Sequence, residues 1–310
     1  MSEELREGLI LKSTGKHYRV LGEDGNSYDA VIKGKWRTKG LRTTNPLAVG
    51  DHVRFTTEKN GDSVIAELIP RINHIIRKSI NLSKESHIVA ANVDQALLIV
   101  TPDEPPTSYG FIDRFLVAAE SYHIPSTIVI NKIDLPNTEE KIAEMMMTYE
   151  MIGYPVLITS AINDKNTDKL KEILKGKVTV LAGHSGVGKS TLINKIEKGL
   201  DLKTSEVSEY HRKGKHTTTF AEMYPLSFGG FIIDTPGIKG YGIVGLEKNE
   251  LALYFPDMAE KLPECKFYNC THINEPKCAV KLAIEEGEIA ESRYRSYVNM
   301  FEEDQSKNYR

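Results

Sequence analysis

A glycine-rich segment of eight residues, GHSGVGKS, constrains this chain more than any other feature. It runs from Gly183 to Ser190 and directly follows the apolar stretch KVTVL, which has the composition of a buried strand. Glycines in such a segment let backbone amides point inward around an anion, and a helix that begins there adds the positive end of its dipole. The segment therefore predicts a phosphate-binding loop between a strand and a helix.

Two further segments complete the predicted phosphate end. Asp234 follows the apolar run FIID and begins DTPG, so we expect Asp234 to hold Mg²⁺ through water and the Gly237 amide to contact the γ-phosphate. Lys189 is expected to reach the β and γ phosphates, and the Ser190 hydroxyl to bind Mg²⁺. Thr218, or a neighbouring threonine of GKHTTT, is expected to close on the ion and the γ-phosphate. The predicted phosphate and magnesium residues are Gly183, His184, Ser185, Gly186, Val187, Gly188, Lys189, Ser190, Thr191, Thr218, Asp234 and Gly237.

The base of the nucleotide is indicated by Asn131-Lys132-Ile-Asp134, which follows the apolar run STIVI. A carboxylate at Asp134 can accept two hydrogen bonds from guanine, whereas adenine offers no such pair of donors. Ser160 and Ala161 follow the next predicted strand, and the amide near Ala161 is a natural donor to guanine O6. The pattern predicts GTP and GDP as ligands and argues against an ATP-driven enzyme.

These motifs occur in an unusual order, because the guanine segment precedes the phosphate loop. Strands and amphipathic helices alternate from about residue 90 onward, which predicts an α/β fold with a doubly wound parallel sheet. Since every motif follows a strand at one edge of that sheet, the site survives a circular permutation. The expected strands are 96–100, 127–130, 156–158, 178–181 and 231–233, and the expected helices are 111–122, 139–151, 167–174 and 189–196.

The first 72 residues predict a separate small β-barrel, most plausibly of the OB type. Its expected strands are 9–12, 17–21, 27–32, 52–56 and 63–68, with an Asn60-Gly61 hairpin signal before the last of them. The segment from Lys33 to Arg42 is basic, has no acidic residue and contains Trp36. It is either an RNA-binding loop or an ordinary solvated loop.

Hydrolysis needs a group that orients water, and the usual glutamine position after DTPG is Ile238 here. His216, in the threonine-rich segment, is the best candidate for that role, because imidazole both donates and accepts hydrogen bonds near neutral pH. The alternative is a surface histidine in a loop. We therefore predict His216, Thr218 and Lys189 as the catalytic residues.

All three cysteines of the chain fall close together, in the pattern Cys265-x4-Cys270-x-His272-x5-Cys278. Three thiolates and one imidazole form the ligand set of a closed structural zinc site, and free buried cysteines are the alternative. We expect one structural zinc ion in a helical module over residues 244–310, with a long helix from Ala279 to about Glu302. The GTPase domain is expected over 73–243 and the barrel over 1–72.

Composition limits the classes of protein that remain. Of the 310 residues, 40% are hydrophobic and 27% charged, with a net charge of −3, a balance typical of a globular protein. No stretch approaches the roughly 20 apolar residues that cross a bilayer, and the start MSEELREGLI has no basic region followed by an apolar core, so we expect no secretory signal. We expect a cytoplasmic monomer that does not associate with membranes.

Together these motifs resemble the RsgA family of circularly permuted GTPases. The likeness covers nearly the whole chain: barrel, NKID, GHSGVGKS, GKHTTT, DTPGI and the cysteine-histidine module in that order. It implies a bacterial factor that binds the small ribosomal subunit and its rRNA late in maturation, with GTP hydrolysis stimulated by the subunit. It also implies that His216 is the catalytic histidine. The alternative function is an RNA-binding scaffold in which GTP is mainly an ordering ligand.

Overall fold

The computed structural model describes residues 5–32, 46–57, 63–78, 86–200, 221–234 and 246–303. They form two compact units. Unit 1 comprises Met1–Leu97, Thr167–Ala182 and Lys189–Lys239, and unit 2 comprises Leu98–Asn166, Gly183–Gly188 and Gly240–Arg310. Within the described ranges, no helix is both long enough and apolar enough to span a bilayer.

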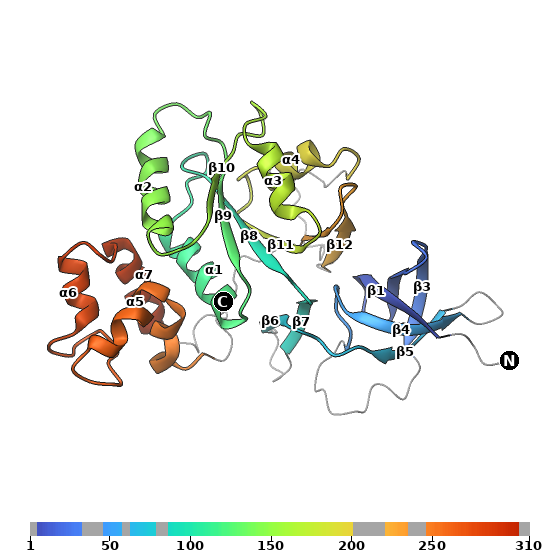
Figure 1. Cartoon of the computed structure of the whole chain (residues 1–310), viewed down its shortest axis with the longest axis horizontal. Coiled ribbons are helices and arrows are strands. Elements are labelled where there is room, and N and C mark those ends of the chain that lie inside the picture. Colours follow the sequence, from blue (N-terminus) through green and yellow to red (C-terminus); the bar gives the residue numbers. More distant parts are fainter. Residues whose placement is uncertain are drawn as a thin grey trace, which may run out of the picture. The chain divides into compact units, whose positions relative to one another are not determined.

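Unit 1 begins with a closed β-barrel of five strands. The strands follow the order β1-β2-β3-β5-β4, and β4 pairs back onto β1 to close the barrel. Side chains alternate between solvent and interior along β2 and β4, as expected for strands with one buried face. The interior is filled by Ile10, Tyr18, Val20, Ala30, Leu47, Val53, Phe55 and Ile65. The strands are β1 (Arg6–Ser13), β2 (His17–Gly22), β3 (Ser27–Ile32), β4 (His52–Thr57) and β5 (Ser63–Leu68), which confirms the predicted barrel (Figure 1).

A buried ion pair fixes the chain where it leaves the barrel. Arg71 donates from Nε and Nη2 to the two carboxylate oxygens of Asp51, at 2.6 Å each, and Asp51 is fully buried. Asp51 also accepts from the amide of Ala48, so its charge is fully paired. The hairpin of β6 (His74–Lys78) and β7 (Ser86–Ala91) follows this junction. The sequence analysis did not predict this hairpin.

The larger sheet continues through unit 1 in the order β8-β11-β13-β12-β1. The central pair, β11 and β13, is parallel, while β12 runs antiparallel to β13 and joins the sheet to the barrel through Lys12 and Glu222. Buried Gln95 donates to the Thr179 hydroxyl and to the Ile173 carbonyl. Helices α3 and α4 pack on one another here. The bounds are β8 (Gln95–Val100), α3 (Thr167–Leu174), β11 (Val178–Ala182), α4 (Lys189–Ile196), β12 (Glu222–Pro225) and β13 (Phe231–Asp234).

In unit 2 the sheet order is β10-β9-β8, and β9 and β10 are parallel. Every residue of β8 and β9 is buried, as the continuous apolar runs predicted. The elements are α1 (Tyr109–Ser121), β9 (Ser126–Ile130), α2 (Glu139–Glu150) and β10 (Val156–Ile158). The predicted α/β layout is therefore confirmed.

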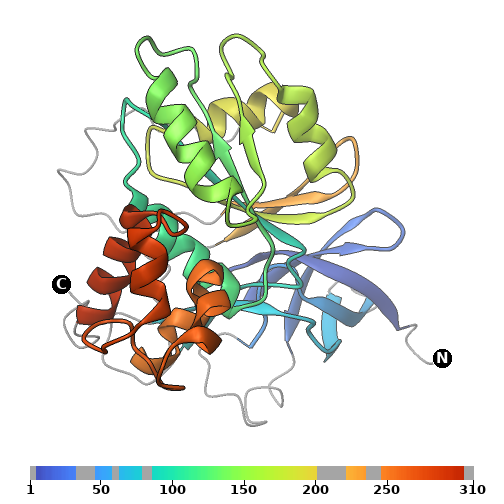
Figure 2. The same cartoon turned by 60° about the vertical axis from the view of Figure 1, so that its left-hand side comes forward.

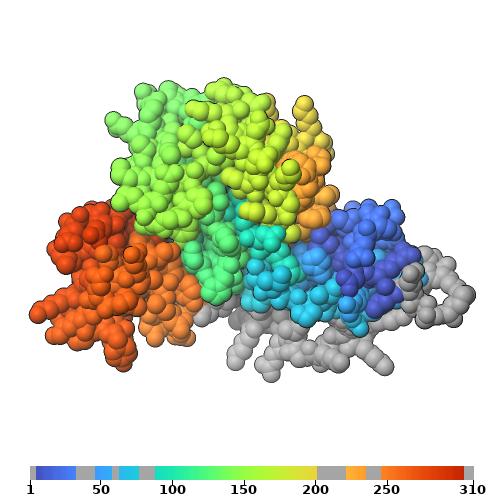
Figure 3. Space-filling model, in the orientation of Figure 1, coloured from blue at the N-terminus to red at the C-terminus, as the bar shows by residue number. Residues whose placement is uncertain are grey.

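The C-terminal part of unit 2 is helical and has its own apolar core, which includes Phe255, Met258, Val280 and Tyr297. Figure 2 shows α7 against α1, and Figure 3 shows the orange and red helices as one compact body in space-filling form. The elements are η3 (Lys248–Tyr254), α5 (Pro256–Lys261), η4 (Leu262–Glu264), α6 (Ala279–Glu285) and α7 (Glu291–Glu302).

The single long helix expected from Ala279 to Glu302 is wrong, because the chain forms α6 and α7 with a break between them. Gly287 has a φ of 76°, a left-handed conformation that ends a helix without cost for glycine. Its amide donates to Ile284, and the Glu288 amide donates to Ala283, which closes the end of α6. The glycine signal outweighed the helical periodicity on both sides.

A buried arginine joins the helical part to the rest of unit 2. Arg293 of α7 donates to Asp113 of α1 at 2.7 Å and to Asp257 of α5 at 2.6 Å. Tyr149 of α2 donates to the same Asp113 oxygen at 3.0 Å. Arg293 and Asp113 are 1% and 0% exposed, so three helices and one tyrosine meet around charges that water does not reach.

Replacing Arg293 by methionine tests this cluster. It leaves Asp113 and Asp257 buried without a counter-charge, so we expect the free energy of unfolding to fall by about 3–5 kcal/mol. Urea denaturation measures the change. Arg295→Met is the matched control, because Arg295 lies on the same helix with an exposed partner, Glu291, and should cost about 0–1 kcal/mol. Equal losses for the two variants would contradict this account.

Candidate functional site

Two glycines shape the predicted phosphate loop within unit 2. Gly183 has a φ of 142°, and a Cβ there would lie 2.3 Å from the Ile99 carbonyl oxygen. Gly188 has a φ of 89°, and a Cβ there would lie 2.5 Å from Nδ2 of Asn131. Only glycine fits both the backbone conformation and the close approach at these positions. The loop is therefore held against the end of β8 and against the first residue of the guanine motif.

Asn131 connects the guanine motif to the phosphate loop. Its Nδ2 donates to the Val187 carbonyl at 2.9 Å, and its Oδ1 accepts from the Thr159 hydroxyl at 3.1 Å. Its amide donates to the Val100 carbonyl at 2.8 Å, and the residue is 1% exposed. One buried side chain thus links the ends of two strands to the loop, although these segments are far apart in sequence.

Asp134 is held by the residues that follow the next strand. Its side chain is exposed, and one carboxylate oxygen accepts from the hydroxyl of buried Ser160. Ser160 in turn accepts from the Asn163 amide at 3.1 Å, and neighbouring Ala161 is buried. Lys132 has a φ of 62° and donates to the Glu104 carbonyl. The structure therefore brings Asp134 and Ser160 together, as the order of strands predicted.

In unit 1, Lys189 begins α4 and Asp234 ends β13. Burial lowers the pKa of Lys189 and raises that of Asp234, and each group opposes the shift of the other. Partial burial of two opposite charges in this way is typical of a site that binds a charged ligand. Among the other phosphate-loop residues, Val187 is buried, Ser190 is partly buried, and Ser185, Gly186 and Thr191 are exposed.

Several predicted residues lie outside the described ranges. They are His216, Thr218, Gly237, Ile238 and the basic segment 33–42 with Trp36. The side chain of His184, by contrast, is described: its ring lies 3.6 Å from that of Phe111, centroid to centroid, with 32° between the planes. The phosphate loop thereby packs against the first turn of α1.

The four predicted metal ligands come together in unit 2. The ligand atoms of Cys265, Cys270, His272 and Cys278 all lie within 4.8 Å of one another. His272 Nδ1 lies 3.7 Å from the sulphur of Cys265 and 3.3 Å from that of Cys278. Tetrahedral zinc, with bonds of about 2.3 Å to sulphur and about 2.0 Å to nitrogen, sets such pairs about 3.6 Å apart. The cluster therefore has the donor set and spacing of a metal site.

The protonation of the cluster fits the same interpretation. Burial lowers the pKa of His272, which keeps the imidazole neutral and able to bind a metal through Nδ1. Burial also raises the pKa of Cys270 to about 12, so its thiol has to lose a proton when a metal binds. A closed set of four protein ligands is typical of a structural site.

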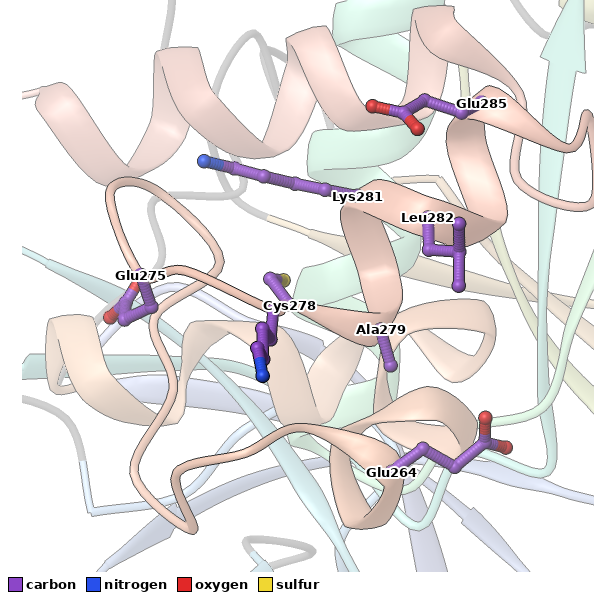
Figure 4. Close-up of a pocket in the computed structure, with 8 residues that line it drawn as sticks. Glu264, Glu275, Cys278, Ala279, Lys281, Leu282 and Glu285 are labelled. Carbon is purple, nitrogen blue, oxygen red and sulfur yellow. The ribbon is translucent and has the colours of Figure 1, made fainter.

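Glu275 holds the backbone around His272. Its carboxylate accepts from the Thr271 amide and hydroxyl at 2.7 Å each, and from the Ile273 and Asn274 amides at 3.0 and 3.1 Å. Burial raises its pKa, but these hydrogen bonds outweigh burial and lower it to about 2. Beside the cluster lies an open hollow that Glu275, Cys278 and Lys281 help to line (Figure 4).

Sequence reasoning missed Glu275 and the buried charges around Arg293. An acidic residue near a metal ligand is too common to signal its role. Asp113, however, is a charge within the apolar pattern of α1, where its neighbours Ile112 and Phe115 are buried. Since a buried charge requires a partner, Asp113 could have indicated a buried ion pair from the sequence alone.

Gly188→Ala tests the phosphate loop. The added methyl group would displace Asn131 and strain the backbone by about 1–2 kcal/mol, so we expect the dissociation constant for fluorescent GDP to rise about tenfold or more. Gly199→Ala is the control, since Gly199 has a similar φ of 102° with nothing within 4 Å of a Cβ. An unchanged constant for Gly188→Ala would contradict the predicted loop.

Comparison with known proteins places the chain in a family. Residues 68–244 match the RsgA GTPase family, and residues 7–65 match the RsgA N-terminal domain. A protein of Christiangramia forsetii named small ribosomal subunit biogenesis GTPase RsgA is 51% identical over 309 residues, which cover 98% of each chain. One of the same name from Bacteroides fragilis is 49% identical over 306 residues, covering 98% of this chain and 99% of that protein.

Two solved structures resemble the chain along nearly its whole length. The crystal structure of YjeQ from Thermotoga maritima has a TM-score of 0.79 and 38% identity, covering 96% of this chain and 98% of that one. The structure of YloQ, a circularly permuted GTPase, has a TM-score of 0.74 and 31% identity, covering 99% of this chain and 97% of that one. The order of motifs, the barrel and the cysteine-histidine cluster agree with these likenesses, and the chain belongs to the RsgA family of circularly permuted GTPases.

Proposed function

We propose that this GTPase binds the small ribosomal subunit late in its maturation and that the subunit stimulates its hydrolysis of GTP. The names of the relatives in Christiangramia forsetii and Bacteroides fragilis, both small ribosomal subunit biogenesis GTPases, support this role. We further propose that the protein acts as a monomer in the cytoplasm, and that its barrel contacts ribosomal RNA. The three proposed modules are residues 1–72, 73–243 and 244–310.

The observation that carries the nucleotide-binding part of the proposal is the hydrogen bond from Asn131, in the guanine motif, to Val187 in the phosphate loop. Asp134 would accept from the base, Lys132 would cover its face, and the Ala161 amide would donate to O6. Ser160 donates to Asp134 and so aims its carboxylate. Because Asn131 is hydrogen-bonded to both Val187 and Thr159, the base and the phosphates would be held in fixed positions relative to one another.

At the phosphate end, Lys189 would contact the β and γ phosphates, and the loop amides would cradle them. Ser190, Thr218 and Asp234 are the proposed magnesium residues, the last through water. Magnesium bound there offsets the charge that develops on the phosphates. The partial burial of Lys189 at the start of α4 and of Asp234 at the end of β13 supports this assignment, since a bound phosphate and its cation would each find a group of opposite charge.

His216 is the proposed catalytic group, orienting the attacking water in place of the glutamine that Ile238 replaces. His216→Ala should lower subunit-stimulated turnover about 100-fold or more, because a positioned acid or base contributes that much to a rate. The variant should keep its affinity for fluorescent GDP. Phosphate release, measured with and without purified small subunits, gives both rates.

The control for this variant is His123→Asn, at an exposed histidine just after α1 with a φ of 55° that asparagine tolerates. It should retain stimulation. Turnover unchanged in His216→Ala would remove His216 from the mechanism. Wild-type turnover that small subunits do not raise would instead favour an RNA-binding scaffold ordered by GTP.

We propose that Cys265, Cys270, His272 and Cys278 hold one structural zinc ion. Metal analysis should find one zinc per chain, and Cys270→Ser should lower that content and the unfolding temperature. Apparent zinc affinity should rise with pH between about 6 and 8, because the cysteine thiols must release protons. Glu285→Gln, which changes the hollow beside the cluster but no ligand, should retain the metal. Full zinc content in Cys270→Ser would contradict the assignment.

A further inference from the structure

Helix α7 carries side chains that hold the metal cluster from behind. Tyr294 donates from its hydroxyl to the His272 carbonyl at 2.7 Å, and Tyr297 donates to the Thr271 carbonyl at 2.6 Å. These two carbonyls belong to the ligand residue and to the residue before it. The backbone that presents His272 to the three cysteines is thus hydrogen-bonded to α7 on one side and to Glu275 on the other.

The same helix is attached to α1 through a different residue. Arg293, directly before Tyr294, pairs with Asp113 of α1 and with Asp257 of α5. Two residues before Asp113, the ring of Phe111 lies 3.6 Å from the ring of His184 in the phosphate loop. A series of hydrogen bonds, ion pairs and a ring contact, joined along α7 and α1, therefore runs from the metal ligands to the phosphate loop, all within unit 2.

These contacts have the physical character needed to transmit a change. Separating the two charges of a buried ion pair is costly, because each charge then stays buried without its partner. A close-packed interior likewise passes a displacement on to its neighbours instead of absorbing it. A metal ion that fixes the His272 backbone should therefore also fix α7, and through Asp113 the first turn of α1.

We propose that α7 couples the metal cluster to the phosphate loop, with Tyr294, Tyr297 and Arg293 as positioning residues, so that metal and guanine nucleotide each strengthen the binding of the other. The proposal rests on the nucleotide and zinc sites proposed above. Every contact in this route belongs to α7, α1 and the two loops that they hold.

The test measures the zinc dissociation constant by equilibrium competition with a chelator, under reducing conditions, with and without saturating GDP. Coupling between sites is reciprocal for binding free energies, and its usual size predicts that GDP tightens zinc binding about fivefold or more. Tyr294→Phe/Tyr297→Phe keeps both rings and removes both hydroxyls. We expect it to bind GDP and zinc but to bring the ratio of the two zinc constants to about one.

The matched control is Tyr154→Phe, which removes the hydroxyl of another buried tyrosine in unit 2, one that donates to Glu120 at 2.9 Å. It should retain the wild-type ratio. Phe111→Leu removes the ring contact at the other end of the series without touching the metal loop. It should bring the ratio of the two zinc constants to about one even if the double tyrosine variant folds poorly.

The outcomes are distinct. A wild-type chain that does not bind fluorescent GDP overturns the proposed nucleotide site and the coupling with it. A chain that binds GDP with an unchanged zinc constant overturns the coupling alone. A GDP effect that persists in both the double tyrosine variant and Phe111→Leu overturns α7 and α1 as its route.

Discussion

The buried charge of Arg293 is the constraint on which unit 2 depends. Its guanidinium lies between Asp113 and Asp257, which come from different helices, with the ring of Phe255 4.8 Å away. Burial lowers the pKa of Arg293, but the two carboxylates outweigh burial and raise it, so the charge is retained. Since a buried charge without its partners is costly, α1, α5 and α7 have to assemble together. The helical part is thereby a component of unit 2, with its own apolar core and a shared ionic centre.

Much of the fold follows from local patterns in the sequence. Strands β2 and β4 of the barrel alternate between buried and exposed residues, and β8 and β9 are mostly apolar and wholly buried, so period and length identify these strands. The helix after Ala279 shows where periodicity alone fails, because Gly287 interrupts it with a left-handed turn. The strands of the hairpin β6-β7, with the sequences HIIRK and SHIVAA, have no comparable pattern of apolar alternation, so period does not identify them.

The sequence predicts which residues form the candidate site better than it predicts the hydrogen bonds that join them. Asn131, Asp134 and Gly188 stand in motifs whose chemistry dictates the residue type, so sequence identifies them directly. The bond from Asn131 to the Val187 carbonyl joins residues 56 positions apart and depends on the tertiary fold. Glu275 is similar: its hydrogen bonds to the ligand loop are local, yet no motif distinguishes it from other surface acids. Chemistry thus selects the reactive groups, whereas packing selects the residues that hold them.

The separation of Asp113 from Arg293 has a consequence for how the protein is made. Synthesis proceeds from the barrel onward, and Asp113 leaves the ribosome 180 residues before the arginine that neutralises it. At about 5–20 residues per second, that interval lasts about 10–40 seconds. During it, the Asp113 carboxylate has no counter-charge, and burying it in that interval would carry the cost of an unpaired buried charge. The interior of unit 2 is thus complete only after Arg293 has been synthesised.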